Sequence, residues 1–147
     1  MASILIVAHA PMASTLLTVA QHTYADCALQ VKTLDVPPQM GLEEATAQVA
    51  AALRALPDAE VLVMVDTFGA TPCNAVLAAV GATARVVTGV NVPMLWRTLC
   101  YGHLPLSELV TRAVDGARQG IMQVAGARRQ DQPQRPLSDD PDANSDQ

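Results

Sequence analysis

Short apolar runs alternate along the chain with longer segments whose apolar residues repeat at helical spacing. Residues 4–8 and 61–65 are continuous apolar runs of strand length, which is typical of strands buried on both faces. The expected strands are residues 4–8, 29–36, 60–66 and 84–90, and the expected helices are residues 12–24, 41–56, 72–80, 93–101 and 107–118. Four strands that each lead into a helix predict a single α/β domain with an open parallel sheet and helices on both faces.

Two of the expected helices have clear sequence signals. In residues 41–56, apolar side chains recur every three or four positions, and Glu43 and Glu44 lie in the first turn, where the helix dipole favours negative charge. Ser107 is of the residue type that caps helices, so we expect it to start the last helix.

Length and composition limit the domain organisation and the function. The chain has 147 residues and a net charge of −5, which suits one domain over residues 1–126 and an acidic, disordered tail over 127–147. The sequence has no basic stripe of the kind that binds nucleic acid, which argues against nucleic acid as a partner. No apolar run approaches the roughly 20 residues of a membrane span. The N-terminus has no signal-peptide pattern, so we expect a cytoplasmic protein.

The three cysteines are Cys27, Cys73 and Cys100, an odd number at wide spacing. They form no CxxC pair and no Cys/His cluster, so the sequence supports neither a zinc site nor a disulfide framework. We expect all three to be reduced and to pack as small apolar side chains.

Polar residues follow the expected strands where a parallel α/β sheet binds its ligands. His9 follows the first strand, Asp66 follows the third, and Thr88 and Asn91 follow the fourth. Ligands of such sheets bind at the carboxyl ends of the strands. If the first and third strands are neighbours, His9 and Asp66 face each other, and the carboxylate would orient the ring and leave its other nitrogen nucleophilic.

The loop after Asp66 completes a possible anion site. It comprises Thr67, Phe68, Gly69, Ala70 and Thr71, and it leads into a helix whose N-terminal N–H groups favour anions. A histidine, a carboxylate and an anion cradle together suggest a phosphoryl group carried on His9. Asp66 as a simple turn residue and the loop as an ordinary connection stay open as alternatives. No Walker loop, dinucleotide fingerprint or metal cluster is visible.

Three segments resemble the IIA component of the mannose family of the bacterial phosphoenolpyruvate:sugar phosphotransferase system. They are ILIVAHA (residues 4–10), VLVMVDTFGATPCNA (61–75) and VVTGVNVPML (86–95). The resemblance extends over about residues 2–125. It implies a sheet of order 2-1-3-4 and a homodimer that can exchange a C-terminal strand, for which residues 120–125 are suitable.

The resemblance also implies a function. His9 would accept a phosphoryl group from phospho-HPr, Asp66 would orient it, residues 67–71 would hold the group, and a IIB component would receive it. No cofactor or metal is needed. Ala10 and Pro11 depart from the glycine common after the histidine, and Phe68 replaces a frequent tryptophan. No IIB domain follows in this sequence, so the acceptor is expected to be a separate protein.

Two alternative functions stay open. The chain is also compatible with a regulatory phosphoprotein of an incomplete system that transports no sugar. A phosphotransfer subunit related to that of dihydroxyacetone kinase is the other possibility. A response-regulator receiver is excluded, because Ala8, His9 and Ala10 stand where a receiver needs an acidic pair.

Overall fold

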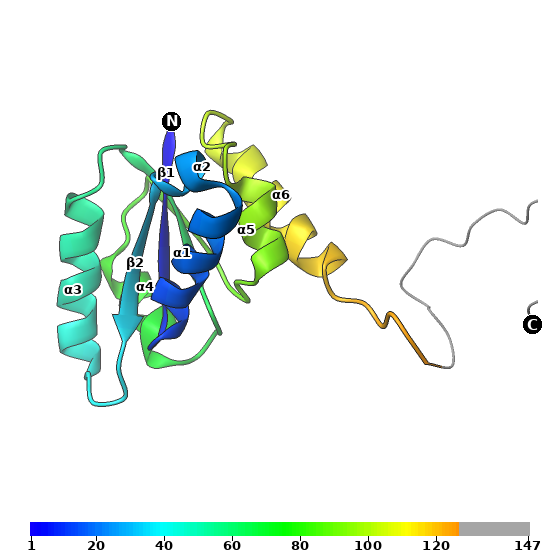
Figure 1. Ribbon diagram of the computed structural model, residues 1–147. Coiled ribbons are helices and arrows are strands. Elements are labelled where there is room, and N and C mark those ends of the chain that lie inside the picture. Colours follow the sequence, from blue (N-terminus) through cyan, green and yellow to red (C-terminus); the bar gives the residue numbers. More distant parts are fainter. Residues whose placement is uncertain (127–147) are drawn as a thin grey trace, which may run out of the picture.

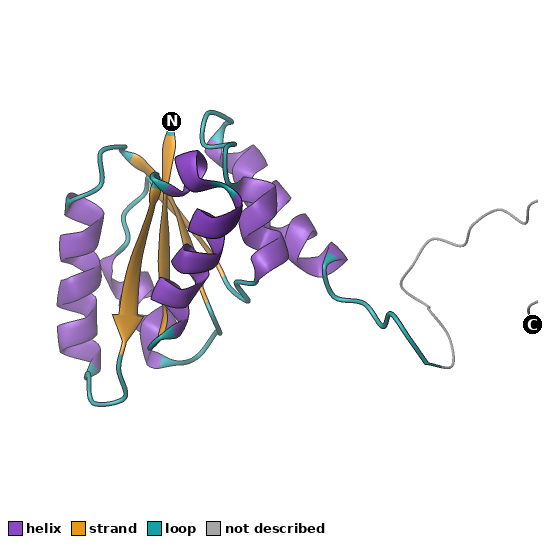
Figure 2. Cartoon of the chain, viewed as in Figure 1, coloured by secondary structure: helices purple, strands orange, loops and turns teal. Residues whose placement is uncertain are grey.

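In the computed structural model, which describes residues 1–126, four parallel strands form one open sheet of order β2-β1-β3-β4. The strands are β1 (Ala2–His9), β2 (Val31–Val36), β3 (Glu60–Val65) and β4 (Ala84–Val87). The helices are α1 (Met12–Thr23), α2 (Ala25–Ala28), α3 (Leu42–Arg54), α4 (Thr71–Ala79), α5 (Val92–Thr98) and α6 (Leu106–Gln119). Figures 1 and 2 show the strands in the middle and the helices on either side. The predicted fold class and strand order are confirmed.

The sheet separates two apolar cores because neighbouring residues of a strand point to opposite faces. Ile4 and Ile6 of β1 pack with α1, α5 and α6, whereas Leu5 and Val7 pack with α3 and α4. All four side chains are at most 3% exposed. Burial on both faces explains why β1 and β3 appear in the sequence as uninterrupted apolar runs.

Several predicted boundaries are wrong in detail, and helix α5 ends at Thr98 rather than at 101. The second strand begins at Val31 rather than at 29, because the short helix α2 ends just before it. The fourth strand ends at Val87, since Gly89 has a φ of +77° and turns the chain out of the extended conformation. Helix α6 starts after Pro105, which makes no side-chain cap, so Ser107 lies inside the first turn and is not its cap.

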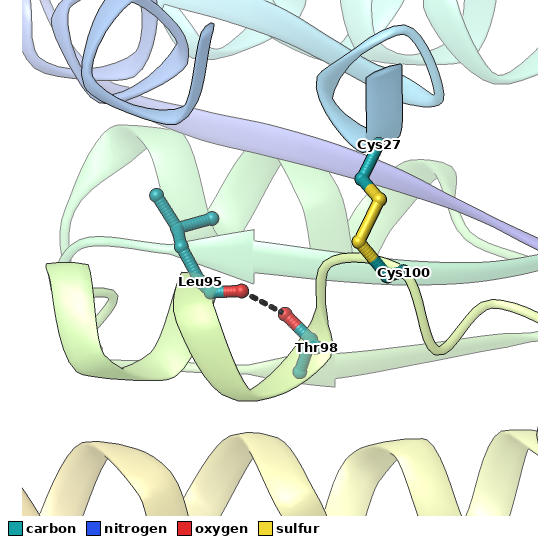
Figure 3. The surroundings of a disulfide bond; sticks show 4 residues. All are labelled: Cys27, Leu95, Thr98 and Cys100. Atoms are coloured by element: carbon teal, nitrogen blue, oxygen red, sulfur yellow. Dashed lines mark hydrogen bonds between the residues drawn. A yellow bond between two sulfur atoms is a disulfide. The ribbon is translucent and has the colours of Figure 1, made fainter. Parts of the chain in front are cut away.

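The prediction of three free thiols is wrong for two of them. Cys27 and Cys100 form a disulfide with a Cα–Cα distance of 5.0 Å, although 73 positions separate them. Figure 3 shows that the bond joins α2 to the chain just after α5, where the Thr98 hydroxyl donates to the Leu95 carbonyl at 3.1 Å. The fold brings two distant segments together here, which the cysteine spacing did not reveal. Cys73 is free and buried, as expected.

The C-terminal part of the described chain and the tail have different outcomes. Residues 121–124 belong to no helix or strand in the single chain. The predicted tail, residues 127–147, lies outside the described residues. Within residues 1–126, no helix has both the length and the apolar character that a membrane crossing needs.

Candidate functional site

His9 and Asp66 meet at the carboxyl edge of the sheet because β1 and β3 are neighbours in parallel register. Val7 pairs with Val65, so the residues that follow lie side by side. The His9 ring nitrogen Nδ1 lies 2.6 Å from Asp66 Oδ2, and the His9 backbone N–H donates to the same oxygen at 3.0 Å. The Thr67 backbone N–H donates to Asp66 Oδ1 at 2.9 Å. Three hydrogen bonds therefore fix the carboxylate against the histidine.

The surroundings of Asp66 keep its carboxylate ionised. Burial alone would raise the pKa of Asp66, and it is the largest single influence. The hydrogen bonds from the His9 backbone and ring, the His9 charge and the Thr67 N–H together outweigh it, so the pKa lies below its ordinary value. An ionised carboxylate only accepts hydrogen bonds, so His9 Nδ1 donates to it, and in the neutral form of the ring Nε2 is then the nitrogen with the lone pair.

The two side chains differ in how far water reaches them. The His9 side chain is 53% exposed, whereas that of Asp66 is 11% exposed. The orienting group is thus held inside the edge of the sheet, and the ring it holds extends into solvent. Such an arrangement can present an oriented nucleophile at the surface.

Residues 67–70 connect Asp66 to helix α4, and Thr71, the last residue of the predicted loop, is the first residue of that helix. Gly69 has a φ of +86°, a left-handed conformation that glycine adopts without steric cost. Ala70 precedes the helix in extended conformation, no side chain caps the helix, and no acidic residue lies in its first turn. Phe68, within this loop, is 76% exposed. A helix N-terminus without a side-chain cap favours anions.

The end of β4 supports Asp66 through the backbone and contributes no reactive side chain. The Gly89 N–H donates to the Asp66 carbonyl at 3.1 Å. Asn91, a candidate edge residue, instead caps α5 by accepting from the Met94 N–H at 2.8 Å, and its amide donates to the Ala117 carbonyl of α6. Thr88 is exposed just beyond the strand. The sequence placed these two residues near the edge but did not reveal that Asn91 is structural.

The other histidines lie away from His9. His22 is exposed near the end of α1. His103 follows Gly102, whose carbonyl accepts from the Ala2 N–H, so it belongs to the opposite edge of the sheet. Among the described residues, no three His, Cys, Asp or Glu side chains are grouped so that they could hold a metal ion.

One contact at this edge was missed by the sequence analysis. Asp35, near the end of β2, accepts a hydrogen bond from the Ser14 N–H at the start of α1. The two residues are 21 positions apart. No local motif signals the pair, because the cap comes from a neighbouring strand rather than from the residue before the helix.

Comparisons with known proteins show the family and the fold of the chain. Residues 3–113 match the family model described as PTS system fructose IIA component. The chain is similar in structure to the mannose/sorbose specific IIA subunit of the phosphotransferase system from Enterococcus faecalis, with a TM-score of 0.78, 23% identity, and coverage of 86% of this chain and 97% of that one. A comparison with curated protein sequences gives no match.

Two further solved structures share the fold. The phosphotransferase system component EIIA from Streptococcus agalactiae has a TM-score of 0.74 at 21% identity, covering 84% of this chain and 97% of that one. The PTS IIA protein associated with the fucose utilization operon from Streptococcus pneumoniae has a TM-score of 0.64 at 27% identity, covering 78% and 93%. With the family model matching most of its residues, the chain belongs to the PTS system fructose IIA component family, the mannose-type EIIA proteins of the phosphotransferase system.

Proposed function

We propose that the protein is a phosphoryl carrier that accepts a phosphoryl group on His9 from phospho-HPr and passes it to a further protein. The observation that carries this proposal is the 2.6 Å contact between His9 Nδ1 and Asp66 Oδ2. In the neutral form of the ring it leaves Nε2 as the oriented nitrogen with the lone pair, on a half-exposed side chain. Family membership supports a phosphotransfer component; the residue, the donor and the acceptor are our proposal.

The transfer step follows from the protonation states at the site. The lone pair of His9 Nε2 attacks phosphorus in line, and the bond from phosphorus to the donor breaks with its electron pair leaving on the donor. Nδ1 keeps its proton, so the ring becomes cationic as the new N–P bond forms. The ionised Asp66 carboxylate, in hydrogen-bond contact with Nδ1, offsets that charge. The step uses no metal ion.

The loop over residues 67–71 is the proposed cradle for the phosphoryl oxygens. Its conformation is set by Gly69 and it leads into the uncapped start of α4. Backbone N–H groups there would stabilise negative charge on the oxygens, as helix N-termini do elsewhere. The exposed Phe68 would contact the partner protein beside His9.

The test is the intact mass of the protein after incubation with phosphoenolpyruvate, enzyme I and HPr. Wild type should gain one acid-labile phosphoryl group, His9→Ala should gain none, and His22→Ala, which changes an exposed histidine of α1, should behave as wild type. A gain in His9→Ala would refute the site. No gain in wild type, with enzyme I and HPr shown to be active, would refute the function.

The acceptor is the second part of the proposal. A separate IIB protein is the first candidate, and a regulatory partner that senses the phosphorylated form is the other. Mixing phosphorylated protein with a purified IIB domain distinguishes them, because only a IIB acceptor removes the group rapidly. Loss of the group only at the rate of spontaneous hydrolysis would favour the regulatory function.

We also propose a homodimer with exchange of a C-terminal strand. Ile121 and Val124 are 71% and 57% exposed after α6, and β4 is one of the two edge strands of the described sheet. Pairing of residues 120–125 with a second copy would bury these side chains. Light scattering of the full chain and of Ile121→Asp tests this: the substitution should shift a dimer toward monomer.

A further inference from the structure

Only Ala10 and Pro11 separate His9 from helix α1, which has no cap of its own. Pro11 precedes its first residue and makes no side-chain hydrogen bond, and the first turn contains no acidic residue. The first N–H groups of a helix lack partners within the helix and need an outside acceptor. The turn that joins His9 to α1 is therefore held in place by something other than a local capping motif.

Asp35 supplies the missing cap from the neighbouring strand. Its Oδ1 accepts from the Ser14 N–H at 3.1 Å. Ser14 is the third residue of α1, the position that a helix-capping side chain ordinarily contacts. Asp35 pairs in register with Ala8, the residue before His9, so the carboxylate lies level with the end of β1.

The same end of β2 holds the backbone just after His9. The Ala10 N–H donates to the Val36 carbonyl at 3.0 Å. On the helix side, the hydroxyls of Ser14 and Thr15 donate to the Pro11 carbonyl at 3.2 and 2.7 Å. The turn is thus fixed at Ala10 by the backbone of β2 and at Ser14 by the Asp35 side chain.

The two strands that flank β1 therefore each provide one aspartate at the same level of the sheet. Asp66, after β3, binds the histidine, and Asp35, on β2, binds the helix that follows it. The α4 N-terminus, in contrast, has no side-chain cap. Of these two helix N-termini, that of α1 is capped by the Asp35 carboxylate, whereas that of α4 has no side-chain cap.

We propose that Asp35 is a positioning residue for phosphoryl transfer, because its hydrogen bond to the Ser14 N–H fixes the turn that carries His9 into α1. This inference rests on the proposed function of His9. Asp35 acts through the backbone and makes no contact with the transferred group. A displaced turn would move the ring relative to the cradle loop, and small displacements of a reacting group cost large factors in rate.

The experiment measures the rate of phosphoryl transfer from phospho-HPr to three variants at a temperature where circular dichroism shows all to be folded. Asp35→Ala removes the acceptor, and Asp35→Asn keeps an oxygen at the same place. Asp58→Ala is the matched control, because Asp58 also makes a hydrogen bond to a distant residue, Ser3, but at the opposite edge of the sheet.

The Asp35 variants and the control variant should differ in their transfer rates. Asp35→Ala should lower the rate at saturating donor about tenfold, with little change in the donor concentration for half-maximal rate. Asp35→Asn should restore most of the rate, and Asp58→Ala should transfer as wild type. A wild-type rate in folded Asp35→Ala, or an equal loss in Asp58→Ala, would overturn the proposal.

A measurement without donor separates this inference from the proposed function. In wild type and Asp35→Ala, nuclear magnetic resonance compares amide exchange at Ser14 and the ring nitrogen signals of His9. Faster exchange at Ser14 together with shifted His9 signals supports the positioning role, even if wild type accepts no phosphoryl group. Faster exchange at Ser14 with unchanged His9 signals would mean that Asp35 only stabilises α1, and would overturn it.

Discussion

The two edges of the sheet are built in opposite ways. At the carboxyl edge, His9, Phe68 and Gly69 are exposed, and the connections that follow β3 and β4 each contain a glycine with positive φ. At the amino edge, the chain is fastened by the Cys27–Cys100 disulfide and by the contacts of Ala2 and Ser3 described below. One edge carries the proposed site, and the other holds distant segments together. Changes at the two edges should therefore affect different measurements.

The amino edge is also tightly packed. The Ala2 N–H donates to the Gly102 carbonyl at 2.7 Å, and a Cβ added at Gly102 would lie 2.9 Å from the Ala2 carbonyl oxygen. The hydroxyl of Ser3, which is 1% exposed, donates to Asp58 Oδ2 at 2.8 Å. The start of β1 is thus bound to the chain after α5 and to the loop before β3. Stabilising contacts and the proposed site thus lie at opposite ends of the strands, which substitutions can test directly.

Breaking the disulfide should have the largest effect. A bond that closes a loop of this length constrains the unfolded chain by about 4 kcal/mol in the chain-entropy model. Reductant, or Cys27→Ser, should lower the free energy of unfolding by up to that amount in denaturant titrations, while folded protein still transfers phosphoryl groups at the wild-type rate. Reductant should have no further effect on Cys27→Ser. An unchanged unfolding midpoint of wild type in reductant would contradict the prediction.

Removing the orienting carboxylate should give the complementary result. Asp66→Ala should slow phosphorylation of His9 by about 10²-fold, because the ring loses the group that fixes its tautomer and offsets its charge. Quenched time courses with phospho-HPr measure this rate, and circular dichroism checks the fold. A rate close to that of wild type would show that Asp66 does not orient His9.

Ser3→Ala should have a smaller effect, confined to stability. Removing the Ser3 hydroxyl loses one hydrogen bond to Asp58 and should cost about 1 kcal/mol of unfolding free energy. Chemical denaturation measures the loss, and the transfer rate should stay unchanged. A slower transfer in folded Ser3→Ala would mean that the two edges are coupled, and would break the comparison.

The smallest effect should appear in the pH dependence of stability. The pKa of Asp66 in the folded protein lies below its ordinary value of 3.8, so its contribution is fully present above that pH and is lost as the pH falls through the folded pKa. Because burial opposes the hydrogen bonds, the net change is small. Denaturation of wild type and Asp66→Asn at neutral pH and at acid pH should show the difference between them shrinking in acid. A difference that grew in acid would mean that folding raises the pKa of Asp66 instead of lowering it.

Much of the fold was predictable because burial on both faces gives parallel strands a continuous apolar signature. The approach of His9 and Asp66 was conditional on β1 and β3 being neighbours, which the apolar pattern alone does not determine. The resemblance to the IIA family supplied the strand order, and the structure confirms it.

The missed features depend on contacts between distant segments. The Cys27–Cys100 bond and the Asp35 cap join positions 73 and 21 residues apart, and neither leaves a local pattern. The misplaced cap at Ser107 has a local cause, because the cap position of α6 is Pro105, two residues before the serine. The type of a residue indicates which interactions its side chain can make. The packing of the fold decides which neighbour is the partner.

The half-exposed ring of His9 gives the proposed carrier a limited storage time. Within residues 1–126 no segment covers the ring fully, so water can approach a phosphoryl group from the same side as a partner protein. Each loaded molecule then has a finite lifetime, during which it must meet its acceptor. The supply of acceptor relative to that lifetime would decide whether phosphoenolpyruvate drives useful transfer or is lost by hydrolysis.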